Sequence, residues 1–200
     1  MPALIRAFVA IELPAPVLAS LTLLQSRLRP RAERAARWVS TQGIHLTLKF
    51  LGDIPLSSIP GITQAMAKAA AKTSPLSLGL SGAGCFPDLQ RPRVVWIGLG
   101  GDLSALAGLQ RAMETELAVV GCAREDRPFT PHLTLARLRD SATPLERLAI
   151  SDGVRTLAVP PSAFTVDKVL LIRSDLRPDG ATYTRLSAVP LQPLDSAACP

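Results

Sequence analysis

With 200 residues and 48% hydrophobic side chains, the chain is long and apolar enough to bury a core, which excludes intrinsic disorder. Its formal net charge of +6 favours a polyanionic partner, nucleic acid above all, although the arginine-rich composition of a GC-rich genome produces the same excess. The apolar run at residues 7–11 is interrupted by Glu12 and Pro14, so it is too short for a signal peptide, and no apolar stretch is long enough to cross a bilayer. The three cysteines are widely spaced and odd in number, which argues against a disulfide framework and predicts a reducing, cytoplasmic location.

In the first half of the chain, hydrophobic periodicity predicts strands that alternate with helices. A strand is expected at residues 4–13 because of its Val, Ile and Phe content, and the prolines at positions 14 and 16 suit the first turn of a following helix. One face of that helix is expected to be buried, through Val17, Leu21, Leu24 and Leu28. The next expected elements are a short strand at 37–40, a strand at 44–51, a helix at 58–72 and an irregular strand at 75–86.

The second half repeats this alternation. A strand at 94–99 precedes a helix that begins after the N-cap residue Asp102 and continues to residue 120. A strand at 131–137, a weak helix at 144–150 and strands at 164–172 and 182–189 follow, the last two joined by a turn at 178–180. Residues 1–191 are expected to form a single catalytic domain and residues 192–200 a loose tail.

The central strand of each half begins with the same tetrapeptide. It is His45-Leu46-Thr47-Leu48 in the first half and His132-Leu133-Thr134-Leu135 in the second, and these two copies contain both histidines of the chain. Each half runs strand, helix, strand, helix, strand, which is typical of an internal duplication. The element order therefore predicts an α+β protein with two pseudo-symmetric lobes, each a mixed sheet flanked by helices, and a central cleft.

The spacing within each motif places its polar side chains on one face of a strand. Because side chains alternate along a strand, the histidine and the threonine point one way and the two leucines point to the core. If both polar faces meet at one cleft, a neutral imidazole can take a proton from water while a protonated one gives a proton to a leaving alkoxide. This pair of proton transfers suits the cleavage of a phosphate ester. The hydroxyls of Thr47 and Thr134 can donate hydrogen bonds to the non-bridging oxygens of such an ester. Lys49 is expected on the same face as His45, either adding a positive charge there or as a solvated lysine at the strand end.

Three other interpretations fit the histidines less well. Ordinary polar residues of a half-exposed sheet do not explain why both histidines recur at matching places in identical motifs. A zinc site needs more ligands than two histidines provide, so no metal is expected. A serine hydrolase triad is not expected because the sequence contains no Gly-x-Ser-x-Gly elbow.

The two motifs and their surroundings resemble the 2H phosphoesterases, and among them the bacterial and archaeal RNA 2′,3′-cyclic phosphodiesterases, also called 2′-5′ RNA ligases. The similar segments are residues 6–13, 45–52, 91–96, 127–137 and 183–184. The resemblance implies a bilobal α+β fold and hydrolysis of an RNA 2′,3′-cyclic phosphate to a 2′-phosphomonoester, with neither metal nor cofactor. It also implies that His45 is the proton donor to the leaving 3′ oxygen and that His132 is the proton acceptor that activates water.

Three further residues are candidate substrate contacts. Phe50 and Arg137 each lie five residues after a motif histidine, and a phenyl ring and a guanidinium plane can sandwich a nucleobase. In a regular strand this odd offset points both away from the histidines, so the role requires a bulge or a strand end. Otherwise they are a core phenylalanine and a surface arginine. Arg127 either holds phosphate or braces its own loop through Glu125 or Asp126.

Two other functions fit parts of the sequence. The same acid and base serve 2′-5′ RNA ligation by microscopic reversibility, and this ligation would be independent of ATP because residues 79–84 lack the Gly-Lys-Ser/Thr ending of an ATP-binding loop. A non-catalytic module that binds RNA ends fits the charge, but it has no need of duplicated histidine and threonine pairs. The sequence thus predicts a monomeric cyclic phosphodiesterase that acts on RNA ends.

Overall fold

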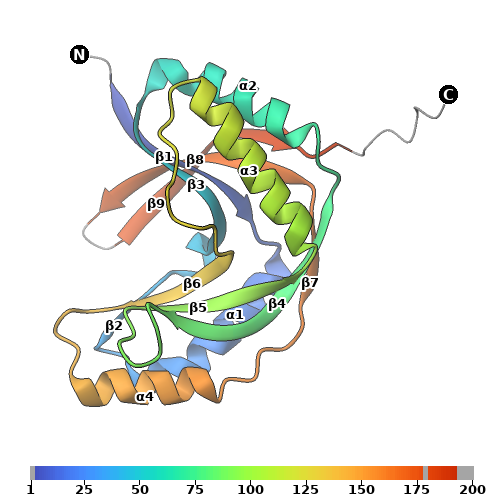
Figure 1. The fold of residues 1–200 in the computed structure, drawn as a ribbon. Coiled ribbons are helices and arrows are strands. Elements are labelled where there is room, and N and C mark those ends of the chain that lie inside the picture. Colours follow the sequence, from blue (N-terminus) through green and yellow to red (C-terminus); the bar gives the residue numbers. More distant parts are fainter. Residues whose placement is uncertain (1–2, 178–179, 193–200) are drawn as a thin grey trace.

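The computed structural model describes residues 3–177 and 180–192, which form two β-sheets with four α-helices packed against them (Figure 1). Sheet A has the strand order β3-β1-β8-β9, with β1 (Leu4–Glu12), β3 (His45–Pro55), β8 (Lys168–Arg177) and β9 (Gly180–Pro190). Sheet B has the order β2-β6-β5-β4-β7, with β2 (Ala36–Trp38), β4 (Leu76–Phe86), β5 (Val94–Gly101), β6 (His132–Leu138) and β7 (Ala163–Val166). The described residues include only Gly180 of the predicted turn at 178–180. They also leave out the predicted tail beyond residue 192, which contains Cys199.

The helices lie in pairs, one pair on each sheet (Figure 1). α2 (Ile59–Ala70) and α3 (Leu103–Val119) pack on each other and on sheet A, and α1 (Ala15–Leu28) and α4 (Pro144–Arg155) pack on sheet B. Short 3-10 turns occur at Arg29–Arg31, Thr41–Gly43 and Leu56–Ser58. None of the helices in the described residues combines the length and the apolarity that a membrane span requires. The predicted α+β class is confirmed, but every strand pair in the described part is antiparallel, whereas mixed sheets were expected.

The chain passes repeatedly between the two sheets. The first half of the chain supplies β1 and β3 to sheet A, yet its last strand, β4, lies in sheet B. The second half supplies β5 and β6 to sheet B, yet its last strands, β8 and β9, lie in sheet A. Each sheet therefore needs strands from both halves, and one continuous hydrophobic core runs through most of the molecule.

Local differences from the predicted elements have identifiable causes. The predicted strand at 164–172 is interrupted at Asp167, where the chain leaves β7 in sheet B and enters β8 in sheet A. The predicted weak helix continues to Arg155, and its start is stabilised by a capping box between Thr143 and Glu146. Asp102 precedes α3 as predicted, but its carboxylate accepts a hydrogen bond from the Ser77 backbone and does not cap the helix.

A glycine in sheet B makes room for a tryptophan that supports the second motif. Gly84 on β4 lies under the Trp96 ring, and a Cβ atom at this position would overlap that ring. Trp96 packs against Phe86 with ring centroids 5.2 Å apart, and Phe86 meets the His132 ring edge to face at 4.9 Å. The absence of a side chain at Gly84 therefore helps to determine the surroundings of His132.

We expect Gly84→Ala to lower the free energy of unfolding by about 1–3 kcal/mol, because the added methyl group overpacks the Trp96 contact. Urea titration of both proteins measures this difference. Gly108→Ala is the matched control: its Cβ would have only Arg111 within 4 Å, and alanine is favoured over glycine inside a helix such as α3 by roughly 0.5–1 kcal/mol. An unchanged stability of Gly84→Ala would show that Trp96 relocates at little cost.

Candidate active site

Each motif strand contains one extra residue directly after its threonine. The pairing of β3 with β1 skips Leu48, and the pairing of β6 with β5 skips Leu135, so both strands have a bulge at the same place in the motif. A bulge of this kind reverses the alternation of the side chains that follow it. Phe50 and Arg137 consequently return to the face of the histidines, which is the condition that their predicted role required.

Both motifs open into one cavity of about 400 Å³ between the two sheets. His45 and Thr47 line it from β3, and His132 and Thr134 line it from β6. The leucines of both motifs are buried on the opposite faces of their strands, as the alternation predicts. Folding therefore brings two half-buried imidazoles from distant parts of the chain to one site.

Each histidine makes the same hydrogen bond to the backbone. Nδ1 of His45 lies 2.8 Å from the Gly43 carbonyl oxygen, and Nδ1 of His132 lies 2.7 Å from that of Thr130. Because a carbonyl oxygen only accepts, Nδ1 must carry the proton in both rings. Nε2 of each ring is then a free acceptor when the imidazole is neutral and a donor when it is protonated. Both rings are thus held in the form that acid–base catalysis at Nε2 requires.

The two imidazoles differ in what surrounds them. His45 is stacked on Phe8 with ring centroids 4.6 Å apart, and the Tyr183 ring meets it edge to face at 5.1 Å. Burial lowers the pKa of His45 below its ordinary value of 6.5, and this effect exceeds the opposing effects of the Gly43 carbonyl and the Glu12 carboxylate. Within the described residues His132 meets one aromatic ring, that of Phe86, in a T-shaped arrangement. Two identical tetrapeptides therefore place their histidines in unlike environments.

Phe50 and Arg137 lie among the residues that line the cavity. The Phe50 side chain is 61% exposed, which is unusual for a phenylalanine and excludes the core position that was the alternative. Arg137 is also exposed and has no salt bridge within the described residues, so its guanidinium is available to a ligand. The two side chains occupy matching positions on the two motif strands.

Two of the predicted substrate contacts do not reach the cavity. The expectation that Lys49 shares the face of His45 is wrong, because the bulge turns Lys49 to the interior, where it is 3% exposed and paired with Glu114. Arg127 is exposed and is not among the cavity residues. Its guanidinium donates to both carboxylate oxygens of Glu125, and together with the Arg127 backbone N–H it lowers the pKa of that carboxyl to about 2, which is the loop-bracing alternative.

The structure adds cavity residues that the sequence did not single out. Arg6 and Phe8 reach the cavity from β1, and Ser174 and Tyr183 reach it from β8 and β9. Arg6 interrupts an otherwise apolar strand, and Tyr183 is the one tyrosine of the chain, so each carries a weak signal. The pairing of β1 with β3 brings Arg6 and Phe8 beside the first motif, and the pairing of β8 with β1 and of β9 with β8 brings Ser174 and Tyr183 there. Within the described ranges, no three His, Cys, Asp or Glu side chains are grouped in a way that could hold a metal ion.

The 2′-5′ RNA ligase superfamily matches residues 16–178, which is most of the chain. The chain belongs to the 2′-5′ RNA ligase superfamily. This confirms the family that the two motifs resemble, and the RNA 2′,3′-cyclic phosphodiesterases among its relatives agree with the predicted enzyme class.

Individual relatives in this superfamily align over different lengths. The RNA 2′,3′-cyclic phosphodiesterase of Thermus thermophilus is 34% identical over 94% of this chain and 90% of its own length. That of Geobacillus stearothermophilus is 33% identical over 77% of this chain, and the match spans about half (47%) of that longer relative. The crystal structure of Escherichia coli LigT complexed with 3′-AMP superposes with a TM-score of 0.74 at 27% identity, over 96% of this chain and all (100%) of that one.

We expect the ring protons of His45 to titrate below pH 6.5 in NMR spectra of the free protein, because burial lowers the pKa of this imidazole. At pH values between that lowered pKa and 6.5, His45 is mostly protonated in the unfolded chain and mostly neutral in the folded protein. The free energy of unfolding should therefore fall as the pH decreases from about 7 to about 5. His45→Phe removes this contribution and should make the stability less dependent on pH over that range. A His45 signal that titrates above 6.5 would contradict the proposed effect of burial.

Proposed function

We propose that the chain hydrolyses RNA 2′,3′-cyclic phosphates to 2′-phosphomonoesters by acid–base catalysis between His45 and His132, without a metal. One observation carries the proposal: two imidazoles from different sheets line one cavity, and each is held with Nδ1 protonated. A cyclic phosphodiester needs one proton removed from water and one delivered to the leaving oxygen. Two histidines with available Nε2 atoms supply both.

In the proposed reaction, a water oxygen attacks phosphorus and the bond between phosphorus and O3′ breaks. Nε2 of His132 accepts the proton from the water, and Nε2 of His45 donates its proton to O3′. The hydroxyls of Thr47 and Thr134 donate to the non-bridging oxygens, on which negative charge accumulates in the transition state. Proton exchange with solvent then restores both rings. The assignment of donor and acceptor follows the family that the motifs resemble.

The lowered pKa of His45 is compatible with a donor role once substrate is bound. In the free protein, burial keeps this imidazole mostly neutral near pH 7. The phosphodiester brings a negative charge into the same cavity, and a nearby opposite charge raises the pKa of an imidazole. Substrate binding then includes the uptake of a proton by His45, which prepares the acid for the leaving oxygen.

The rim of the cavity suits a nucleotide. We propose that the Phe50 ring and the Arg137 guanidinium stack on the two faces of the terminal nucleobase, which fits their exposed positions on the two motif strands. Arg6 adds a further positive charge at this rim. The binding of 3′-AMP by the related LigT supports a nucleotide ligand.

We further propose that residues 1–191 act as one monomeric catalytic domain, because both sheets contain strands from both halves. A cytoplasmic location stays a prediction.

We expect the purified protein to open adenosine 2′,3′-cyclic phosphate to the 2′-phosphate in the presence of EDTA, with a bell-shaped dependence of rate on pH. His45→Ala and His132→Ala should each lower kcat by about 100- to 10,000-fold, and the double variant should be little slower than either. Chromatographic separation of the 2′- and 3′-phosphates identifies the product.

Arg155→Ala is the control for these histidine variants, because its side chain lies on α4 and pairs only with Asp152 among the described residues. The Arg155→Ala variant should keep full activity. Circular dichroism should show that this variant and the three histidine variants are folded. Loss of the wild-type activity on addition of EDTA would contradict the metal-independent mechanism, and an active His132→Ala variant would contradict the paired roles.

We expect Phe50→Ala to raise KM for adenosine 2′,3′-cyclic phosphate by roughly 5- to 150-fold with little change in kcat, since stacking on a base contributes about 1–3 kcal/mol. Ribose 2′,3′-cyclic phosphate has no base and is the matched control substrate. Its KM should be the same for Phe50→Ala and the wild type. An equal rise in KM for both substrates would contradict the stacking role, because it would show that Phe50 contacts the phosphate or the ribose and not the base.

A further inference from the structure

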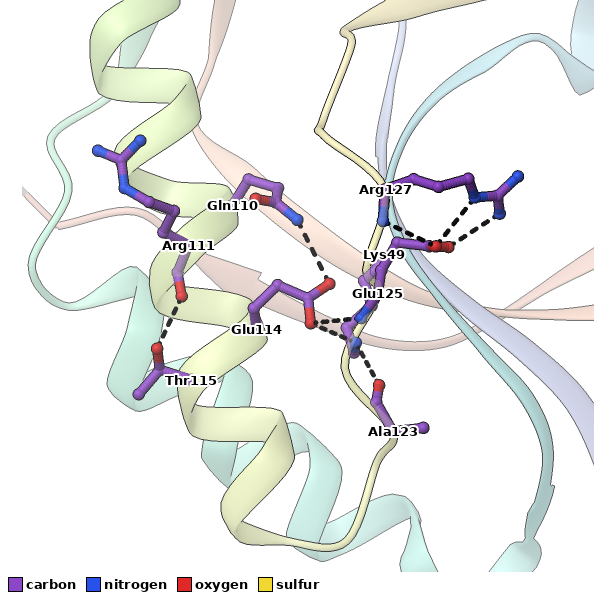
Figure 2. A network of polar contacts seen from close by, with 8 residues as sticks. All are labelled: Lys49, Gln110, Arg111, Glu114, Thr115, Ala123, Glu125 and Arg127. Carbon is purple, nitrogen blue, oxygen red and sulfur yellow. Dashed lines mark hydrogen bonds and ion pairs between the residues drawn. The ribbon is translucent and has the colours of Figure 1, made fainter.

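Lys49 forms a buried polar connection between three parts of the fold (Figure 2). It lies on β3, two residues after Thr47, and its ammonium is 2.6 Å from Glu114 Oε2 on α3 and 2.7 Å from the Ala123 carbonyl oxygen. The Lys49 side chain is 1% exposed and that of Glu114 is 13% exposed, so water competes little for these contacts. The bulge that removes Lys49 from the cavity thus directs it into this network.

The contacted segment, residues 121–131, leads directly to the second motif and contains no helix or strand. At its start, Glu114 also accepts a hydrogen bond from the Glu125 backbone N–H at 3.3 Å. Near its end, the Thr130 carbonyl oxygen holds Nδ1 of His132. Within the described part of the chain, residues 123–129 form hydrogen bonds with the rest of the protein only through Lys49 and Glu114.

The charges at this place need an explanation other than stability. A buried ion pair is often replaced by apolar residues of similar volume without loss of stability, because desolvation of the charges offsets their attraction. Hydrogen bonds of an ion pair nevertheless fix distances and directions, which apolar contacts do not. A pair that joins the first motif strand to the segment before the second motif is suited to fixing one motif relative to the other.

We propose that Lys49 and Glu114 are positioning residues that hold the segment 121–131, and through the Thr130 carbonyl the imidazole of His132, in the geometry that accepts a proton from water. The effect on catalysis rests on the function proposed above, whereas the effect on the His132 ring does not. His45 provides an internal comparison, because its carbonyl partner, Gly43, lies in a different segment that Lys49 does not contact.

The decisive variant is the double replacement Lys49→Met/Glu114→Leu, which removes the ion pair without leaving one charge buried alone. We expect it to stay folded and to lose about 100-fold in kcat for adenosine 2′,3′-cyclic phosphate with a nearly unchanged KM, as a misplaced catalytic group does. In nitrogen-15 NMR spectra, neutral His132 should become a mixture of the two tautomers while His45 keeps its proton on Nδ1. Lys49→Arg, which keeps the charge and the N–H donors, should retain more activity than Lys49→Met.

Asp126→Asn is the matched control, because it neutralises an exposed carboxylate in the same segment that makes no hydrogen bond or ion pair among the described residues. It should leave kcat and both tautomers unchanged. Full activity of the folded double variant would overturn the proposal, as would an activity loss in which His132 keeps Nδ1 protonated. If the wild type lacks the proposed activity, the NMR comparison of His132 with His45 still tests the positioning role.

Discussion

The bulge directly after the threonine of each motif determines which side chains of that strand reach the cavity. The histidine and threonine of each motif lie on the cavity face, before the bulges at Leu48 and Leu135. The bulges then return Phe50 and Arg137 to that same face. Without them, Phe50 and Arg137 would point into the layers behind the sheets, and Lys49 would occupy the cavity face. Because the bulge occurs in both copies, both walls present a histidine, a threonine and then a third side chain at matching positions, which is Phe50 on one wall and Arg137 on the other.

The cavity also depends on how the two sheets are built. Each sheet contains strands from both halves of the chain, so neither wall forms before distant segments have paired. β1 shows this dependence most clearly, since it pairs with β3 on one side and with β8 on the other. That arrangement brings Phe8 and Tyr183 against the His45 ring. The rings that bury this imidazole on β3 therefore come from β1 and from β9, which pairs with β8.

The two halves of the site are similar in their backbone and different in their surroundings. Both Nδ1 atoms bond to the carbonyl oxygen of the residue two positions earlier, which gives both rings the same tautomer. The neighbours then diverge: stacked aromatic rings bury His45, whereas His132 follows a segment that is attached through Lys49 and Glu114. Under the proposed mechanism an acid and a base must have different roles, and the unlike surroundings of two identical motifs are compatible with this.

The sequence by itself determined the α+β class, most strands and helices, and the four motif residues that line the cavity, because repeated short patterns and the period of a strand are local properties. It left the positions of Phe50 and Arg137 open and misplaced Lys49, because a bulge is defined by pairing with another strand and leaves no mark in the alternation of residues. Only the tertiary structure decided that Arg6, Phe8 and Tyr183 join the site and that Arg127 does not. These residues are brought to the site, or kept from it, by the order of strands in sheet A and by long-range contacts, which no window of neighbouring residues contains.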